Sequence, residues 1–171
     1  MALIFQFGSN CDVSRLNGDD RLRDDAKVIG IAETVEDYQL AFDVCSTREK
    51  CAAANIVRLP GSRVWGVLYE VPDYLIRRET AGSRKSLDAI EGEGENYERG
   101  CISVRRPDGR IVEALTYRTR EPQSGLRTST GYVRHIVLGL REQGAPEDYI
   151  REVKEIAKAN NPGIAAEVDA L

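Results

Sequence analysis

Four apolar segments follow one another between residues 28 and 71, and they decide the fold. They read VIGIAETV at 28–35, YQLAFDV at 38–44, AANIVRL at 53–59 and RVWGVLYEV at 63–71. β-Branched and aromatic residues are frequent in all four, which is typical of β-strands. Adjacent strands of this kind predict a sheet that is able to close on itself.

Further strands are predicted on both sides of this region. Residues 2–7 form a short apolar run that stops at Gly8, which predicts a buried strand. CISVRR at 101–106 and RIVEALTYR at 110–118 are joined by Pro-Asp-Gly at 107–109. The preset φ of proline and the permissive glycine favour a tight turn, so these two segments predict a hairpin.

Helices are predicted in the second half of the chain. A short one runs through SLDAIE at 86–91 and stops at Gly92. Two amphipathic helices follow, each with apolar residues at helical spacing that should pack on the sheet. These residues are Val133, Ile136, Val137 and Leu140 in the first helix, and Tyr149, Val153, Ile156 and Ala157 in the second. We expect the tail from Asn160 onward to be loose.

Composition limits the classes of function. The 171 residues, 42% hydrophobic and 30% charged, predict one globular domain over residues 1–171, since a domain has roughly 150 residues. The chain has 24 Lys and Arg against 28 Asp and Glu, so it lacks the basic surplus of nucleic-acid-binding proteins. We find no apolar stretch of about 20 residues and no signal peptide, which predicts no membrane partner and a cytoplasmic location.

A metal centre is not expected. The four cysteines form no C-x-x-C pair, and His135 is the single histidine. A zinc site built from cysteine and histidine therefore has no support in the sequence.

The segment FQFGSN at residues 5–10 joins a strand to a polar turn. Gly8 lets the backbone approach a ligand closely, and consecutive N–H groups in such a turn form an anion-binding nest. The alternative is structural: Gly8 makes only a turn, and Ser9 or Asn10 caps a helix that starts near Asp12.

Glu91 is the candidate for proton transfer. Leu87 and Ile90 are three residues apart and point inward, which places Glu91 beside an apolar face in the last helical turn. Burial and the negative end of the helix dipole both raise the pKa of a carboxyl group there. The alternative is an exposed glutamate in front of a capping glycine.

Four segments in this order resemble the γ-glutamylcyclotransferase family over most of the chain. They are FQFGSN, VWGVLYEV, LDAIEG followed by Tyr97, and TGYVRHIVLGLREQGAPEDY. The resemblance implies an α+β fold, a small mixed and mostly antiparallel β-barrel flanked by helices. It places a substrate cavity at the mouth of the barrel.

The same resemblance implies the site residues. The backbone of residues 8–10 would hold the γ-glutamyl group, Glu91 matches the catalytic acid and base, and Tyr97 and Tyr132 match tyrosines that border the pocket. Phe7 stands where the family usually has a tyrosine, so the hydrogen bond of that hydroxyl group is absent.

The implied activity is cyclisation of γ-glutamyl amino acids or amines to 5-oxoproline, with release of the amino acid or amine. It implies a small-molecule substrate, a monomer or homodimer, and neither cofactor nor metal. Two alternatives stay open: another γ-glutamyl substrate, such as a γ-glutamylamine, glutathione or a secondary metabolite, and a non-catalytic binding module of the same fold, which Phe7 favours.

Two charged stretches are longer than a minimal member of the family needs. Residues 17–27, NGDDRLRDDAK, lack apolar periodicity and predict a solvated loop or short exposed helix. Residues 73–82 precede the helix of Glu91. Both are candidates for bordering the cavity.

Overall fold

The computed structural model describes residues 1–171. Five strands close into a barrel in the order β1-β5-β2-β6-β7. The barrel strands are β1 (Ala2–Gln6), β2 (Lys27–Thr34), β5 (Trp65–Val71), β6 (Glu98–Arg105) and β7 (Ile111–Arg118). The β1–β7 pair is parallel and all other barrel pairs are antiparallel. This confirms the expected α+β fold with a mixed, mostly antiparallel barrel.

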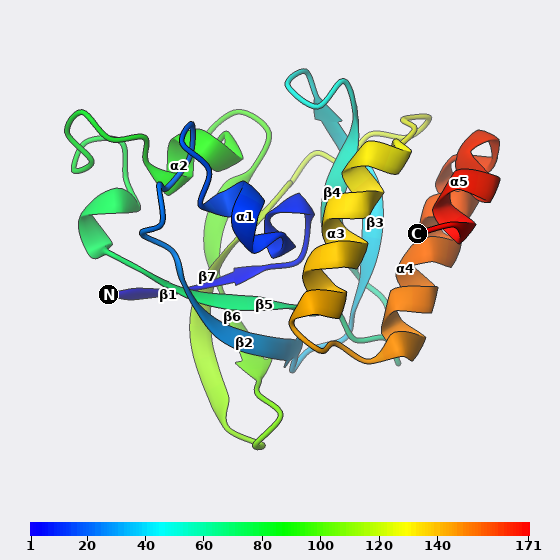
Figure 1. Ribbon diagram of the computed structural model, residues 1–171, viewed down its shortest axis with the longest axis horizontal. Coiled ribbons are helices and arrows are strands. Elements are labelled where there is room, and N and C mark those ends of the chain that lie inside the picture. Colours follow the sequence, from blue (N-terminus) through cyan, green and yellow to red (C-terminus); the bar gives the residue numbers. More distant parts are fainter.

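The four segments between residues 28 and 71 do not form one continuous sheet, which corrects the simplest interpretation of the sequence. The second and third of them, β3 (Tyr38–Ser46) and β4 (Cys51–Arg58), pair only with each other. β2 pairs directly with β5, so the hairpin between them is excluded from the barrel. It forms a separate two-stranded ribbon beside α3 and α4 (Figure 1).

The helices lie outside the barrel. The two long ones are α3 (Thr130–Glu142) and α4 (Glu147–Asn160), which pack against each other (Figure 1). The apolar residues predicted for these helices are buried, apart from Ile156, which is partly buried. The short elements are the 3-10 turns η1 (Ser9–Cys11), η2 (Asp73–Leu75) and η3 (Pro162–Ile164) and the helices α1 (Val13–Leu16), α2 (Leu87–Glu91) and α5 (Ala165–Asp169).

Gly139 lets α3 approach the first turn of the chain. A Cβ atom there would lie 2.3 Å from the carbonyl carbon and oxygen of Cys11 and 2.5 Å from the nitrogen of Asp12. Real Cβ atoms do not come so close to backbone. The absence of a side chain at Gly139 therefore sets the distance between α3 and the segment that follows Gly8.

The expectation of a loose tail after Asn160 is wrong. The side-chain amide of Asn160 donates to the carbonyl oxygens of Phe42 and Leu126, at 3.2 and 3.0 Å, and its Oδ1 accepts from the Thr128 nitrogen at 2.7 Å. Val168 of α5 is fully buried. The tail is held because one amide satisfies three backbone groups and because α5 covers apolar surface.

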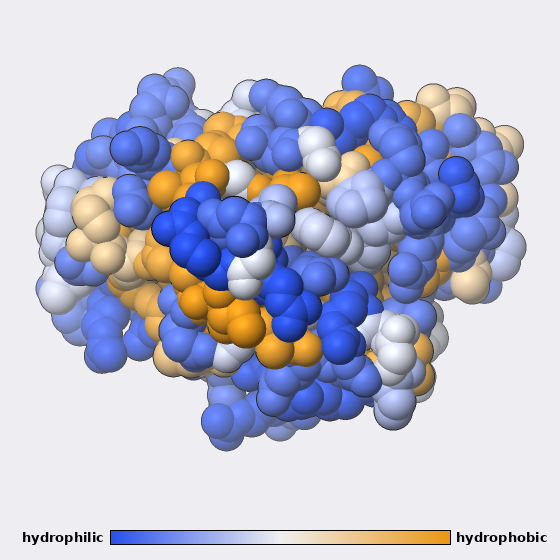
Figure 2. Space-filling view, turned by 90° about the horizontal axis from the view of Figure 1, so that it is seen from below, coloured by the Kyte–Doolittle hydropathy of each residue, from blue (hydrophilic) through white to orange (hydrophobic).

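Hydrophilic residues cover most of the face seen in Figure 2, and hydrophobic residues come to the surface between them near its middle. The exposed large hydrophobic side chains of the whole molecule are Met1, Leu59, Tyr74, Ile111 and Leu138. None of the helices has both the length and the apolar character that a bilayer span requires.

Candidate functional site

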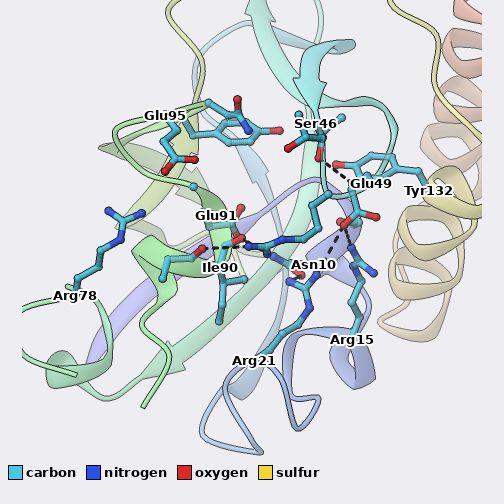
Figure 3. A pocket seen from close by; sticks show the side chains of 18 residues that line it. Asn10, Arg15, Arg21, Ser46, Glu49, Arg78, Ile90, Glu91, Glu95 and Tyr132 are labelled. Atoms are coloured by element: carbon cyan, nitrogen blue, oxygen red, sulfur yellow. Dashed lines mark hydrogen bonds and ion pairs between the residues drawn. The ribbon is translucent and has the colours of Figure 1, made fainter. Parts of the chain in front are cut away.

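A cavity of about 200 Å³ lies where the segment after β1, the turn of the ribbon and the end of α2 meet (Figure 3). A second hollow of about 30 Å³ adjoins it toward the barrel. The two share five lining residues: Ser9, Asn10, Glu91, Tyr97 and Tyr132. Phe7 and Gly8 line the smaller hollow. The residues proposed from the sequence are thus gathered in one place.

The local sequence explains how α2 presents Glu91. The hydroxyl of Ser86 accepts a hydrogen bond from the Ala89 nitrogen at 3.1 Å and caps the start of the helix. Gly92, with φ 73°, ends it in the left-handed conformation that glycine adopts without strain. Ile90 is buried, and Glu91 as the last helical residue faces the cavity.

The carboxylate of Glu91 is fixed through one of its oxygens. Gln6 Nε2 and Asn10 Nδ2 both donate to Oε1, at 2.8 and 2.7 Å. Burial raises the pKa of Glu91, while these two hydrogen bonds oppose the rise. The second oxygen, Oε2, accepts no hydrogen bond from the protein. The carboxyl group is therefore held in a defined orientation, and its burial disfavours the charged form.

Asp88, one turn before Glu91, attaches α2 to the barrel. Its buried carboxylate forms an ion pair with Arg99 of β6 and accepts a hydrogen bond from the Tyr117 hydroxyl of β7 at 2.7 Å. Removing one partner of a buried pair leaves an uncompensated polar group. The position of Glu91 thus depends on a buried network that reaches two barrel strands.

The segment from Gly8 to Asn10 presents main-chain N–H donors that bind no main-chain carbonyl. The N–H groups of Cys11 and Asp12 donate to the carbonyls of Gly8 and Ser9, whereas those of residues 8–10 have no main-chain acceptor. The helix cap expected at Ser9 or Asn10 is instead Asp12, whose side chain accepts from the Arg15 nitrogen at 3.1 Å. Ser9 and Asn10 are therefore not used as caps.

Asn10 is held from three sides. Its Nδ2 donates to Glu91, its Oδ1 accepts from Arg21 Nη1 at 3.1 Å, and its carbonyl oxygen accepts from the Tyr69 hydroxyl at 2.9 Å. These contacts fix which end of the amide faces the carboxylate. Gln6, Arg21 and Tyr69 were not predicted as site residues, because each lies in a strand or charged loop whose residue pattern does not indicate a site.

Tyr97 and Tyr132 both bind Ala54 of the ribbon. The Tyr97 hydroxyl donates to the Ala54 carbonyl at 2.6 Å, and the Tyr132 hydroxyl accepts from the Ala54 nitrogen at 3.0 Å. Burial raises the pKa of Tyr132 to about 12 and that of Tyr97 well above its usual value. Both side chains are neutral donors or acceptors at physiological pH, and they tie the ribbon to the site.

Phe7 is 5% exposed, and its ring centroid lies 6.4 Å from that of Phe5. It contributes an apolar wall to the smaller hollow. The site is therefore built with phenylalanine packed against the core at this position.

The two charged stretches each supply an arginine to the cavity lining, Arg21 from residues 17–27 and Arg78 from residues 73–82. The interpretation of 17–27 as a solvated loop is wrong in part, because Arg21 is only 7% exposed and Leu22 is fully buried. A run of charged residues in the sequence does not reveal which residue of the loop points inward.

No group of three or more His, Cys, Asp or Glu side chains is placed to hold a metal ion.

Known proteins resemble the chain in sequence and structure. A model of the AIG2-like family matches residues 63–153. The γ-glutamylcyclotransferase of Mus musculus is 28% identical over 159 residues, covering 90% of this chain and 78% of that protein. That of Bos taurus is 25% identical over 170 residues, covering 96% and 84%.

A solved γ-glutamyl cyclotransferase structure superposes with a TM-score of 0.74 at 25% identity, covering 90% of this chain and 86% of the other. The resemblance that the motifs predicted is thereby confirmed. Because the family model spans more than half of its length, the chain belongs to the AIG2-like family, and it has the fold of the γ-glutamyl cyclotransferases.

Proposed function

We propose that this protein is a γ-glutamylcyclotransferase that converts γ-glutamyl amino acids or amines to 5-oxoproline. The observation that carries the proposal is the placement of Glu91, which faces the cavity within hydrogen-bond distance of Asn10 and leaves Oε2 free. The names of the sequence relatives support the same activity.

In the proposed reaction the α-amine of the substrate attacks its own γ-carbonyl carbon. A new C–N bond closes the five-membered ring, the amide C–N bond breaks, and the amine leaves. Since nucleophile and electrophile belong to one molecule, a cavity that holds the substrate in its bent form supplies much of the proximity effect. The chemistry needs no cofactor.

Glu91 is the proposed proton carrier. Transfer from an ammonium group of pKa near 7.8 to an ordinary glutamate of pKa near 4.3 is uphill by about 3.5 pKa units, or about 4.8 kcal/mol. Each unit by which burial raises the pKa of Glu91 removes about 1.4 kcal/mol from this gap. The same proton then passes to the departing nitrogen. The N–H groups of residues 8–10, which have no main-chain acceptor, would hold the α-carboxylate or the developing oxyanion.

The direct test is release of 5-oxoproline from γ-glutamyl-alanine and several other γ-glutamyl dipeptides. We expect turnover of at least one of them by the purified protein. A well-folded preparation that releases none, at any pH between 5 and 9, would contradict the proposal and favour a binding module.

The pH dependence of kcat/KM should show the raised pKa of Glu91. The base form is needed, so activity falls as the pH is lowered through that pKa, and burial moves this point upward from about 4.3. We expect an acid limb with its midpoint above 4.3, and no such limb in the residual activity of Glu91→Gln. Circular dichroism over the same range controls for unfolding. A midpoint at or below 4.3 would contradict the role of burial.

Substitution of Gly8 should weaken substrate binding. A Cβ atom there would lie 3.1 Å from the Tyr132 hydroxyl and 3.3 Å from the Ala54 side chain, which is tighter than ordinary contact. We expect a modest rise in KM for Gly8→Ala and a rise of about tenfold or more for Gly8→Val, since its extra methyl groups displace the turn. If both variants keep the parental KM and melting midpoint, this turn has no part in binding.

A further inference from the structure

The outer part of the cavity carries more positive than negative side chains. Four arginines line it, Arg15, Arg21, Arg48 and Arg78, against three glutamates, Glu49, Glu91 and Glu95. Figure 3 shows Arg15 and Arg21 reaching in from one side next to Asn10, with Arg78 apart from them near Glu95. The surplus is larger still when Glu91 carries a proton.

Arg21 is the buried cation of this group. The only hydrogen bond of its guanidinium group runs from Nη1 to Asn10 Oδ1, so most of its five side-chain donors have no partner in the protein. Glu91, Asp20 and Glu49 are the carboxylates around it, and only Glu49 comes within ion-pair distance: its Oε1 lies 3.9 Å from Arg21 Nη2 and forms the closer ion pair with Arg15. A guanidinium that is 7% exposed and lines a cavity with unused donors is arranged for an anion.

Arg48 is the second cation without a carboxylate. It lies in the turn between β3 and β4 and reaches across to α2, donating to the Ile90 carbonyl at 2.9 Å and to that of Ala89 at 3.5 Å. These acceptors are neutral, and no carboxylate forms an ion pair with Arg48. Burial and the nearby Arg48 lower the pKa of Lys85, which agrees with a local excess of positive charge.

We propose that Arg21 and Arg48 bind two carboxylates in the leaving part of the substrate, so that the preferred substrates are γ-glutamyl derivatives of acidic amino acids. This inference rests on the proposed function. An acidic amino acid carries one carboxylate on its α-carbon and one on its side chain, which matches two cations. An uncharged leaving amine would leave both guanidinium groups without an anion.

γ-Glutamyl-glutamate and γ-glutamyl-glutamine are the probes, because they differ by one charge and have nearly the same shape. Their Kd values are measured by calorimetry on Glu91→Gln, which is expected to bind substrate and to turn it over about 10²- to 10⁴-fold more slowly, and their kcat/KM values are measured on the parent protein. We expect γ-glutamyl-glutamate to bind about 10- to 100-fold more tightly, the effect of one charge-assisted contact, and kcat/KM to follow the same order.

The ratio of the two Kd values, γ-glutamyl-glutamine over γ-glutamyl-glutamate, should fall by about tenfold when Arg48→Gln is combined with Glu91→Gln. Arg48 is exposed at the mouth, so the variant is expected to fold. Arg21→Lys keeps a buried charge and serves as the second variant, with a smaller ratio expected because lysine lacks the planar fork. The matched control is Arg134→Gln, an exposed arginine outside the cavity lining, which should leave the ratio unchanged.

Equal Kd values for the two dipeptides, or no binding of either, would overturn the inference, as would a ratio that survives in both arginine variants. Failure of the proposed function has a different signature. The parent enzyme would then release no 5-oxoproline from either dipeptide, whatever the ratio of their Kd values.

Discussion

Glu91→Gln should lower the turnover of γ-glutamyl-alanine by about 10²- to 10⁴-fold, the usual effect of removing a general acid–base group. The glutamine keeps an oxygen that accepts from Gln6 and Asn10, as Oε1 does now, so the geometry of the site is preserved. What is lost is the proton acceptor. The measurement is 5-oxoproline release under saturating substrate, compared with the parent enzyme.

The stability of Glu91→Gln at neutral pH should equal or exceed that of the parent. Burial raises the folded-state pKa of Glu91 above its unfolded value, so its contribution to stability is present at low pH and is lost as the pH rises through the folded pKa. A neutral amide avoids that loss. Thermal unfolding of both proteins at pH 5 and pH 8 gives the difference between their melting midpoints, which should favour Glu91→Gln more at pH 8 than at pH 5.

Glu95→Gln is the matched control for activity, because Glu95 lines the same cavity but is exposed. It should keep turnover within about twofold of the parent, since exposed charges act weakly through water. A parental rate in Glu91→Gln, or an equal loss in both variants, would refute the role given to Glu91.

Gly139→Ala should cost about 3 kcal/mol of stability or prevent folding. The new Cβ would lie 2.3 Å from the backbone of Cys11, so α3 or the segment after Gly8 has to move. Neither contact atom belongs to a flexible side chain. Urea unfolding monitored by circular dichroism gives the change in free energy, and the surviving folded protein should show a raised KM because residues 8–10 are displaced with Cys11.

Gly131→Ala, on the same helix, is expected to raise the free energy of unfolding, whereas Gly139→Ala lowers it. A Cβ atom there meets nothing within 4 Å, so alanine only restricts the unfolded chain and favours the helix. The expected gain is about 0.5 to 1 kcal/mol. If Gly139→Ala is as stable as Gly131→Ala, the close approach of α3 does not limit the fold.

The features that the sequence predicted correctly are those with a local cause. Periodic apolar residues predicted α3 and α4, and the Pro107–Gly109 turn predicted the β6–β7 hairpin. Glu91 was proposed from its place before Gly92 and from family motifs; it lines the cavity, and its role as proton carrier stays a prediction. The exclusion of the β3–β4 ribbon from the barrel was not predictable, because strand propensity says nothing about which strands pair.

The parts of the site that escaped prediction depend on contacts between distant segments. Gln6 lies in an otherwise apolar strand, and its partner Glu91 is 85 residues away. Arg21 resembles its neighbours in a charged loop, yet it alone contacts Asn10. Such residues become visible only when the fold brings their partners together. Their roles in binding and catalysis stay predictions that the variants above address.

The separate β3–β4 ribbon divides the protein into a barrel that holds Glu91 through α2 and a rim that lies outside the barrel sheet. The ribbon is held in its middle, where Tyr97 and Tyr132 bind Ala54, while its tip carries Arg48 and Glu49 outside the barrel sheet. Changes in the length or charge of this tip cost the barrel little, since surface turns tolerate replacement. Grafting tips of different charge onto one barrel should therefore change the charge of the cavity lining while the position of Glu91 stays the same.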